Sequence, residues 1–82
     1  MSQPPTRLSD LMLNDRGYVF DPNTGESYQL SATGLAVVRG LLRGEGVAAI
    51  LKDLIRGHEV DPLEARADLD AFLWDLQQLG WL

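Results

Sequence analysis

Cysteine is absent from the sequence, and histidine and lysine occur once each, as His58 and Lys52. Without cysteine the chain can form neither a disulfide framework nor a thiolate metal site, which fits a reducing cytoplasm. The single histidine lies in a predicted connector beside Glu59 and Asp61, with no second ligand at metal spacing and no nucleophile to activate. We therefore expect a protein that is not an enzyme and that has no catalytic residue, bound metal or cofactor.

Positive charge is scarce, because 7 Lys and Arg residues stand against 12 Asp and Glu residues and give a net charge of −5. The arginines are scattered and form no basic stripe, so the phosphate backbone of a nucleic acid would be repelled. Long apolar runs are absent too, and the first seven residues resemble neither a signal peptide nor a transmembrane segment. These features predict a cytoplasmic protein with no nucleic-acid partner and no membrane partner.

The length of 82 residues allows one domain with one core. A domain of this size buries only roughly 60–65% of the surface that its unfolded chain exposes, so most apolar residues are needed for stability. Residues 1–6 are expected to be a disordered lead-in, because Pro4, Pro5 and their polar neighbours offer nothing to bury. Residues 7–82 are expected to form the domain.

Three short extended segments occupy the first third of the chain. Leu11 and Leu13 alternate with other residues as in a half-buried strand. Residues 18–20 are aromatic or β-branched, and residues 26–30 alternate between polar and apolar side chains. The pattern predicts three strands, of which the first is the weakest.

The turn between the second and third segments carries the strongest local signal. Pro22 presets φ at the first turn position, and Gly25 accepts a positive φ. These residues predict a β-hairpin that places Tyr28 and Leu30 on one face.

Two helices are predicted after the hairpin. Ser31 can cap a helix over residues 32–43, which Gly44 ends. Residues 47–57 place apolar side chains at i, i+3, i+4, i+7 and i+8, a full amphipathic stripe that Gly57 closes.

A third helix is predicted from Pro62 to about Leu79. Asp61 can cap it, proline is favoured at its first position, and Gly80 stops it. The tail residues Trp81 and Leu82 can fold back as an apolar clasp. The fold class is therefore α+β, a three-stranded antiparallel sheet followed by three helices (βββααα).

The third helix has two apolar faces. The predicted core arc consists of Ala65, Leu69, Phe72, Leu73, Leu76 and Leu79. A second, narrower stripe consists of Leu63, Ala67, Ala71 and Trp74, and a core does not need it. Two interpretations of Trp74 stay open: it packs under the N-terminal segment or the first strand, or it is exposed and a partner covers it.

Several short motifs follow one another in a distinctive order. They are residues 17–34 (GYVFDPNTGESYQLSATG), 41–44 (LLRG), 60–62 (VDP) and 68–73 (DLDAFL). Together they resemble the PqqD-like family of RiPP recognition elements, and the resemblance covers about residues 8–82. Ser31 stands where asparagine is common in that family, and Val38 where a bulky aromatic such as tryptophan is common, which fits a divergent branch with its own leader partner.

The resemblance implies a winged helix-turn-helix-like fold that acts as a peptide chaperone in natural product biosynthesis. Such a protein binds the leader of a ribosomally made precursor peptide and presents it to a modifying enzyme or a leader peptidase. The leader adds as an antiparallel strand to the third strand, in the groove against the third helix. Strand addition needs an open sheet edge, which the segment at 26–30 would supply at the end of the hairpin.

The resemblance also implies two sides of the peptide site. The strand edge consists of Glu26, Ser27, Tyr28, Gln29 and Leu30, and the helical wall consists of Arg66, Leu69, Asp70, Leu73 and Trp74. The helical wheel does not determine which flank of the third helix meets the third strand. Asp68 and Phe72, on the other flank, are therefore an alternative wall.

Two other functions are compatible with the sequence. A winged helix could bind DNA through its third helix, but that helix carries four carboxylates against Arg66 alone, so its contact with phosphate would be repulsive. A purely structural docking subunit would use Trp74 without any peptide. An unpaired strand and an exposed stripe also permit a homodimer.

Overall fold

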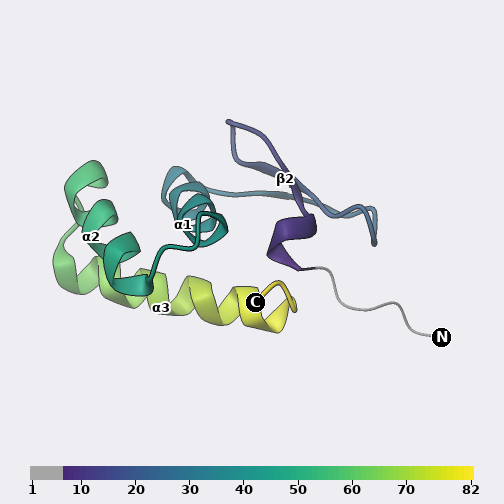
Figure 1. The fold of residues 1–82 in the computed structure, drawn as a ribbon. Coiled ribbons are helices and arrows are strands. Elements are labelled where there is room, and N and C mark those ends of the chain that lie inside the picture. Colours follow the sequence, from purple (N-terminus) through teal and green to yellow (C-terminus); the bar gives the residue numbers. More distant parts are fainter. Residues whose placement is uncertain (1–6) are drawn as a thin grey trace.

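A computed structural model describes residues 7–82 of the chain, so the disorder expected for residues 1–6 lies outside the described residues. A three-stranded antiparallel sheet is followed by three helices, which confirms the predicted α+β class. In Figure 1, α1 lies between the sheet and α2, and α3 runs along one side of the molecule. In chain order the elements are η1 (Leu8–Asp10), β1 (Met12–Leu13), β2 (Tyr18–Phe20), β3 (Ser27–Gln29), α1 (Ala32–Leu42), α2 (Val47–His58) and α3 (Pro62–Gln78).

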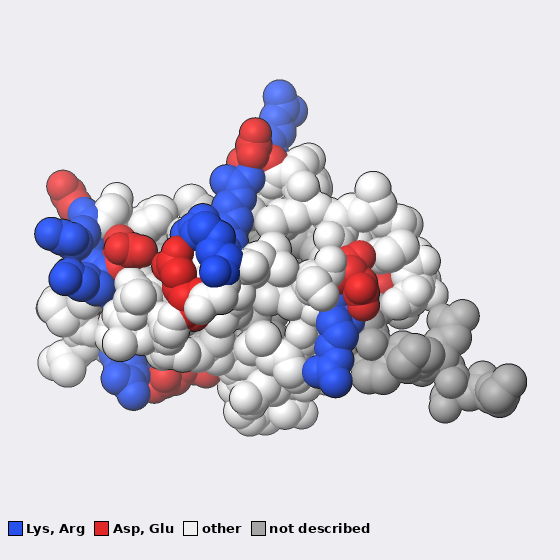
Figure 2. Space-filling view, viewed as in Figure 1, with Lys and Arg blue, Asp and Glu red and all other residues white. Residues whose placement is uncertain are grey.

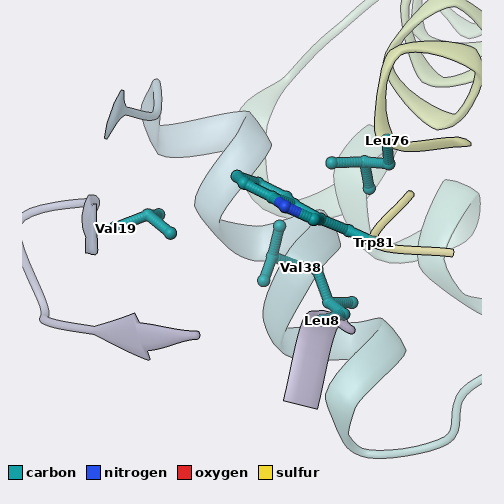
Figure 3. Close-up of a cluster of buried hydrophobic side chains, with 5 residues drawn as sticks. All are labelled: Leu8, Val19, Val38, Leu76 and Trp81. Atoms are coloured by element: carbon teal, nitrogen blue, oxygen red, sulfur yellow. The ribbon is translucent and has the colours of Figure 1, made fainter. Parts of the chain in front are cut away.

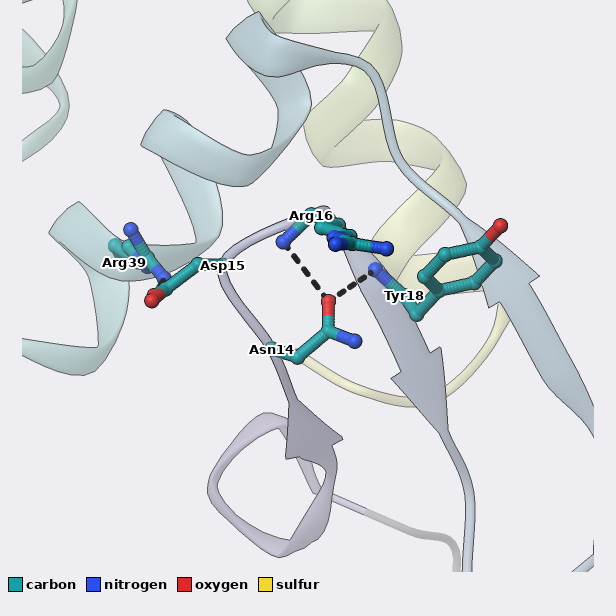
Figure 4. Close-up of polar contacts among 5 residues, drawn as sticks. All are labelled: Asn14, Asp15, Arg16, Tyr18 and Arg39. Atoms are coloured by element: carbon teal, nitrogen blue, oxygen red, sulfur yellow. Dashed lines mark hydrogen bonds and ion pairs between the residues drawn. The ribbon is translucent and has the colours of Figure 1, made fainter.

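The turn between β1 and β2 is organised by the side chain of Asn14 (Figure 4). Its Oδ1 accepts hydrogen bonds from the backbone N–H of Arg16 at 2.9 Å and of Tyr18 at 3.1 Å. Gly17 completes the turn with φ +85°, and a Cβ added there would lie 2.6 Å from the carbonyl oxygen of Leu30. Glycine is therefore required at this position, both for the backbone conformation and for the close approach of the hairpin.

The hairpin between β2 and β3 forms as predicted. Its loop contains Gly25 at φ +77°, and the N–H of Gly25 donates to the carbonyl oxygen of Asp21 at 2.8 Å. The Oδ1 of Asp21 accepts a hydrogen bond from the N–H of Asn23 at 2.9 Å. Asp21 is buried, so this carboxylate has a structural role in the loop that the turn pattern alone did not indicate.

Helices α1 and α3 begin at the predicted caps. The hydroxyl of Ser31 accepts a hydrogen bond from the N–H of Gly34 at 3.1 Å. The carboxylate of Asp61 accepts from the N–H of Leu63 and of Glu64, at 3.2 and 3.3 Å. These bonds satisfy N–H groups in the first turn that have no partner inside the helix.

The predicted end of α2 at Gly57 is wrong. The helix continues through Gly57 to His58, and Glu59 ends it with φ +52°, in the left-handed region. A glycine inside a helix costs only about 1 kcal/mol relative to alanine, so it does not stop a helix by itself. The helix ends where a residue takes the left-handed conformation, whichever residue that is.

Two groups of buried side chains form the core. The sheet-side cluster, drawn in Figure 3, joins the N-terminal segment, β2, α1, α3 and the C-terminal tail through Leu8, Val19, Val38, Leu76 and Trp81. The helix-side cluster joins the three helices through Val37, Ile50, Leu54 and Leu69. Half-buried Phe72 packs against both clusters, so α3 lies against the sheet-side and the helix-side parts of the core alike.

The C-terminal clasp is confirmed for Trp81, which is 3% exposed, and is wrong for Leu82, which is 42% exposed at the end of the chain. The N–H of Leu8 donates to the carbonyl oxygen of Trp81 at 2.9 Å, so the two ends of the described chain are joined by a backbone bond. The prediction that Leu79 belongs to the core arc is wrong, because it is 45% exposed. Leu79 follows the last helical residue, and the chain leaves the helix there through Gly80 at φ +80°.

Within residues 7–82, no helix combines the length and the apolar character that a membrane span requires.

Candidate functional site

One edge of the sheet is formed by β3, because the strand order is β1-β2-β3. A backbone bond marks each end of the β2–β3 ladder. The N–H of Leu30 donates to the carbonyl oxygen of Gly17 at 2.8 Å, and the N–H of Asp21 donates to that of Glu26 at 2.9 Å. Gly17–Leu30 and Asp21–Glu26 are therefore hydrogen-bonded pairs of the antiparallel ladder.

Between these two ends, hydrogen-bonded and non-hydrogen-bonded pairs alternate along the ladder. Val19 lies opposite Tyr28, two residues from either marked pair, so these two residues also turn their N–H and C=O groups toward each other. The β1 side of the sheet agrees with this assignment. The N–H of Asn14 donates to the carbonyl oxygen of Tyr18 at 3.2 Å, which shows that Tyr18 directs its backbone groups toward β1 and away from β3.

Ser27 and Gln29 lie opposite Phe20 and Tyr18 on β2, but as the non-hydrogen-bonded pairs of the ladder. Their N–H and C=O groups point away from β2, along the outer edge of the sheet. No backbone hydrogen bond to these outward groups occurs within residues 7–82. The edge predicted from the sequence is thus open in the described chain, and it offers the backbone groups of two residues in the spacing that a further strand would pair with.

Side chains alternate across β3. Ser27 and Gln29 are exposed on the outer face of the sheet. Tyr28 and Leu30 are half-buried on the inner face, where both pack against the sheet-side cluster, as predicted. The ring of Tyr28 meets that of Trp81 edge to face, with centroids 5.1 Å apart and an interplanar angle of 85°. This contact fixes β3 against the core while its outer edge stays free.

A hollow of about 290 Å³ lies directly after β3, between the start of α1 and one flank of α3. We call it the α1–α3 hollow. It is lined by Ser31, Thr33, Gly34, Val37, Leu54, Asp68, Leu69 and Phe72. Its volume is below that of most small-molecule pockets, which measure roughly 300–1,000 Å³, and suits one or two side chains of a peptide.

Gly34 lies opposite the ring of Phe72 at this hollow. A Cβ added to Gly34 would lie 3.5 Å from the ring of Phe72, in ordinary van der Waals contact. Any longer side chain would collide with the ring or enter the hollow. The small residue at this position therefore keeps the hollow open beside the end of β3.

The phenol of Tyr28 donates a hydrogen bond to the carboxylate of Glu26, two residues away on the same face of β3. This bond is the main cause that raises the pKa of Tyr28 above 10.0, and burial of the ring and the negative charges of Glu26 and Asp21 act in the same direction. The folded state thus holds the phenol proton more tightly than the unfolded chain does. The resulting stabilisation is complete below about pH 10 and is lost as the pH rises through the raised pKa.

Replacing Glu26 with glutamine is expected to lower the pKa of Tyr28, because the charge that favours the protonated phenol is removed. The chain has two tyrosines, so a Tyr18→Phe background makes Tyr28 the single phenol in an ultraviolet absorbance titration. We expect a lower midpoint for the double variant Tyr18→Phe/Glu26→Gln than for Tyr18→Phe. Equal midpoints would show that Glu26 does not hold this proton.

The structure places the predicted helical wall on more than one side of α3. Leu69 is buried and lines the α1–α3 hollow, and Leu73 is half-buried against the helix-side cluster. Arg66 lies on the flank toward α2, where its Nε donates to the carboxylate of Asp70 at 3.2 Å. Trp74 is 59% exposed. Of the five residues, the structure brings Leu69 alone to the α1–α3 hollow. Peptide contacts by all five stay predictions.

Trp74 lies on the side of α3 opposite its buried residues. At 100° per residue it stands about 160° from Leu76 and 140° from Leu69, both of which are in the core. Of the two interpretations left open by the sequence, exposure is the one found in the described chain. The second, narrower stripe of α3 is therefore a solvent-facing surface, and Leu63 at its N-terminal end is 83% exposed.

Residues 16–82 match the family model described as coenzyme PQQ synthesis protein D (PqqD). The chain belongs to the PqqD family. This is a family of RiPP recognition elements and takes part in the biosynthesis of PQQ and other ribosomally made natural products. Neither a curated protein nor a solved structure shows significant similarity to the chain.

In this PqqD-family chain, Asp68 and Phe72 form the flank of α3 that reaches the hollow. They are the alternative wall that the helical wheel left open. The contribution of α1 through Thr33 and Gly34 was not predicted. The available signal was the Thr33-Gly34 pair in the first turn of the helix, because a glycine there leaves space for a neighbouring element.

Within residues 7–82, no group of three or more His, Cys, Asp or Glu side chains is placed to hold a metal ion. On the face of the molecule in Figure 2, basic side chains are dispersed among acidic ones and do not form a continuous basic patch. An ion pair of this kind, between a basic and an acidic side chain, joins Arg39 of α1 to Asp15 in the β1–β2 turn (Figure 4).

Proposed function

We propose that this PqqD-family protein binds the leader of a ribosomally made precursor peptide by strand addition to β3. The observation that carries the proposal is the open edge of β3, where Ser27 and Gln29 turn their backbone groups outward beside the α1–α3 hollow. Main-chain hydrogen bonds along such an edge give affinity, and pockets for alternate side chains give specificity.

The register of β3 determines how an added strand would be oriented. Leader residues opposite Ser27 and Gln29 would exchange backbone bonds with them and direct their side chains to the outer face. Leader residues opposite Tyr28 and Leu30 would direct theirs to the inner face, toward α3 and the α1–α3 hollow. A leader with apolar residues at alternate positions therefore fits, since Leu69 and Phe72 present apolar side chains there.

Residues 7–82 would act as a non-catalytic adaptor in the cytoplasm, holding the leader while a modifying enzyme or leader peptidase acts on the rest of the precursor. The DNA-binding alternative has little support, because α3 carries four carboxylates against one arginine. A gel shift at low salt is expected to show no complex. The purely structural alternative would be favoured if the partner enzyme bound without any precursor.

The test is a fluorescence-anisotropy titration with a labelled leader from a precursor encoded beside this protein. We expect a Kd in the micromolar range or lower, which corresponds to a binding free energy of roughly −8 kcal/mol or more negative. Failure of every such leader to bind would contradict the proposal.

Filling the α1–α3 hollow is expected to weaken that binding by about tenfold or more, which corresponds to about 1.4 kcal/mol. Thr33→Trp places a large ring at the hollow from the first turn of α1, where Thr33 is half-buried. The control is Ala32→Trp, one position earlier on the exposed side of the same turn. Equal affinities for the two variants would place the leader away from the hollow.

A further inference from the structure

A wider hollow of about 470 Å³ lies between α2 and α3. We call it the α2–α3 groove. It is lined by Val47, Ala48, Leu51, Lys52, Ile55 and Arg66. Ile50 and Leu54 lie on one side of the apolar stripe of α2 and are buried in the core. The same stripe continues into the groove, where its side chains are only partly covered by the described chain.

The floor of the groove is apolar and extends over two turns of α2. Val47, Leu51 and Ile55 recur every four residues, which spans about 12 Å along the helix axis. Val47 is exposed, and Leu51 and Ile55 are half-buried. Exposed Leu63, one turn before Arg66 on α3, extends the apolar surface beyond the groove. Contiguous apolar surface of this kind on a small domain is typical of an interaction site.

The charged groups that line the groove are both cationic, although the chain as a whole has a net charge of −5. Lys52 has no ion pair within residues 7–82. Arg66 is paired with Asp70 through its Nε, at 3.2 Å, so Lys52 is the lining cation whose charge no ion pair compensates within residues 7–82. The groove therefore combines an apolar floor with positive charge, which favours a ligand that is apolar and acidic.

We propose that the α2–α3 groove docks an acidic amphipathic helix of a partner protein. Apolar side chains at i, i+3 or i+4, and i+7 of such a helix match the two-turn floor, and flanking carboxylates match Lys52 and Arg66. A second copy of this chain fits less well. A two-fold interface places the same patch on both sides, which would bring the cationic groups of two grooves together.

The groove lies apart from the proposed leader site. Arg66 and Asp68 are two residues apart on α3 and so point about 160° apart around its axis, and the α2–α3 groove shares no lining residue with the α1–α3 hollow. Figure 1 shows α2 at the end of the molecule away from the sheet. A helix in the groove and a strand on β3 can therefore be bound at the same time, and the groove does not depend on the leader proposal.

The test selects helix-forming peptides from a displayed library against the whole protein and maps the selected peptides by amide chemical shifts. We expect selected peptides to carry Asp or Glu beside apolar residues at helical spacing, and to shift the amides of α2 and Arg66. The exposed change Lys52→Glu should weaken their binding by roughly fivefold. A peptide with its acidic residues changed to lysine should bind the Lys52→Glu protein better than the unchanged protein.

Four outcomes would overturn the proposal. They are selected peptides that are neutral or basic, shifts that map to β3 or the α1–α3 hollow, a charge exchange that leaves the affinities unchanged, and a selection that returns no helical binder. Concentration-dependent shifts of the same α2 amides in the protein alone would indicate a second copy as the occupant, which also contradicts an acidic partner helix.

Discussion

Replacing Trp81 with alanine is expected to destabilise the protein by about 3–5 kcal/mol, the range measured for large-to-small changes of buried aromatic residues. The indole is buried in the sheet-side cluster and meets the ring of Tyr28 edge to face, so its loss leaves a cavity where the C-terminal tail, α1 and the sheet join. The free energy of unfolding of a small domain is low, so a loss of this size is a large fraction of it. Thermal unfolding followed by circular dichroism should shift downward by roughly 12–40 °C.

The control is the other tryptophan of the chain. Trp74 is of the same size but exposed on α3, and Trp74→Ala should change the free energy of unfolding by no more than about 0.5 kcal/mol. The two variants remove the same number of atoms from different environments. Similar shifts in melting temperature for Trp81→Ala and Trp74→Ala would contradict the burial on which this prediction depends.

Replacing Ser27 with proline is expected to weaken leader binding by about tenfold to a hundredfold. Proline removes the outward N–H of Ser27, which would leave one leader carbonyl without a donor at a cost of about 1–3 kcal/mol. The ladder with β2 does not use this N–H, and proline is tolerated on edge strands where the N–H faces solvent. The fold should therefore survive the change, which circular dichroism can verify.

Ser27→Ala is the matched control, because it removes the hydroxyl and keeps the backbone N–H. We expect its affinity for the leader to stay within about twofold of the unchanged protein, since the side chain lies on the exposed outer face. Loss of binding in both variants would indicate recognition through the serine side chain. Retained binding in Ser27→Pro would mean that the leader does not pair with this edge.

Local patterns predicted most of the fold. The hairpin and the caps at Ser31 and Asp61 follow from turn and capping chemistry that acts over a few residues, and all three were confirmed. The end of α2 was misplaced, because a glycine is only one way to end a helix and Glu59 adopts the left-handed conformation instead. The short η1 helix was not predicted, and it lies in a segment whose leucines also suited a strand.

The candidate site was predicted only in part, for a different reason. The open edge could be inferred from β3 being the last strand of a hairpin. The helical wall could not, because a wheel gives the faces of α3 but not its rotation against the sheet. That rotation depends on long-range packing of Phe72 and Leu76 in the core, which turns Asp68 toward the α1–α3 hollow and Trp74 toward solvent.

Amide hydrogen exchange at β3, measured by nuclear magnetic resonance with and without the leader, examines the open edge at single residues. In the free protein the N–H groups of Ser27 and Gln29 should exchange rapidly, while that of Tyr28, which pairs with β2, should be protected. A bound leader strand should slow exchange at Ser27 and Gln29 and leave Tyr28 protected. A complex in which Ser27 and Gln29 still exchange rapidly, or a free protein in which they are already protected, would contradict strand addition at β3.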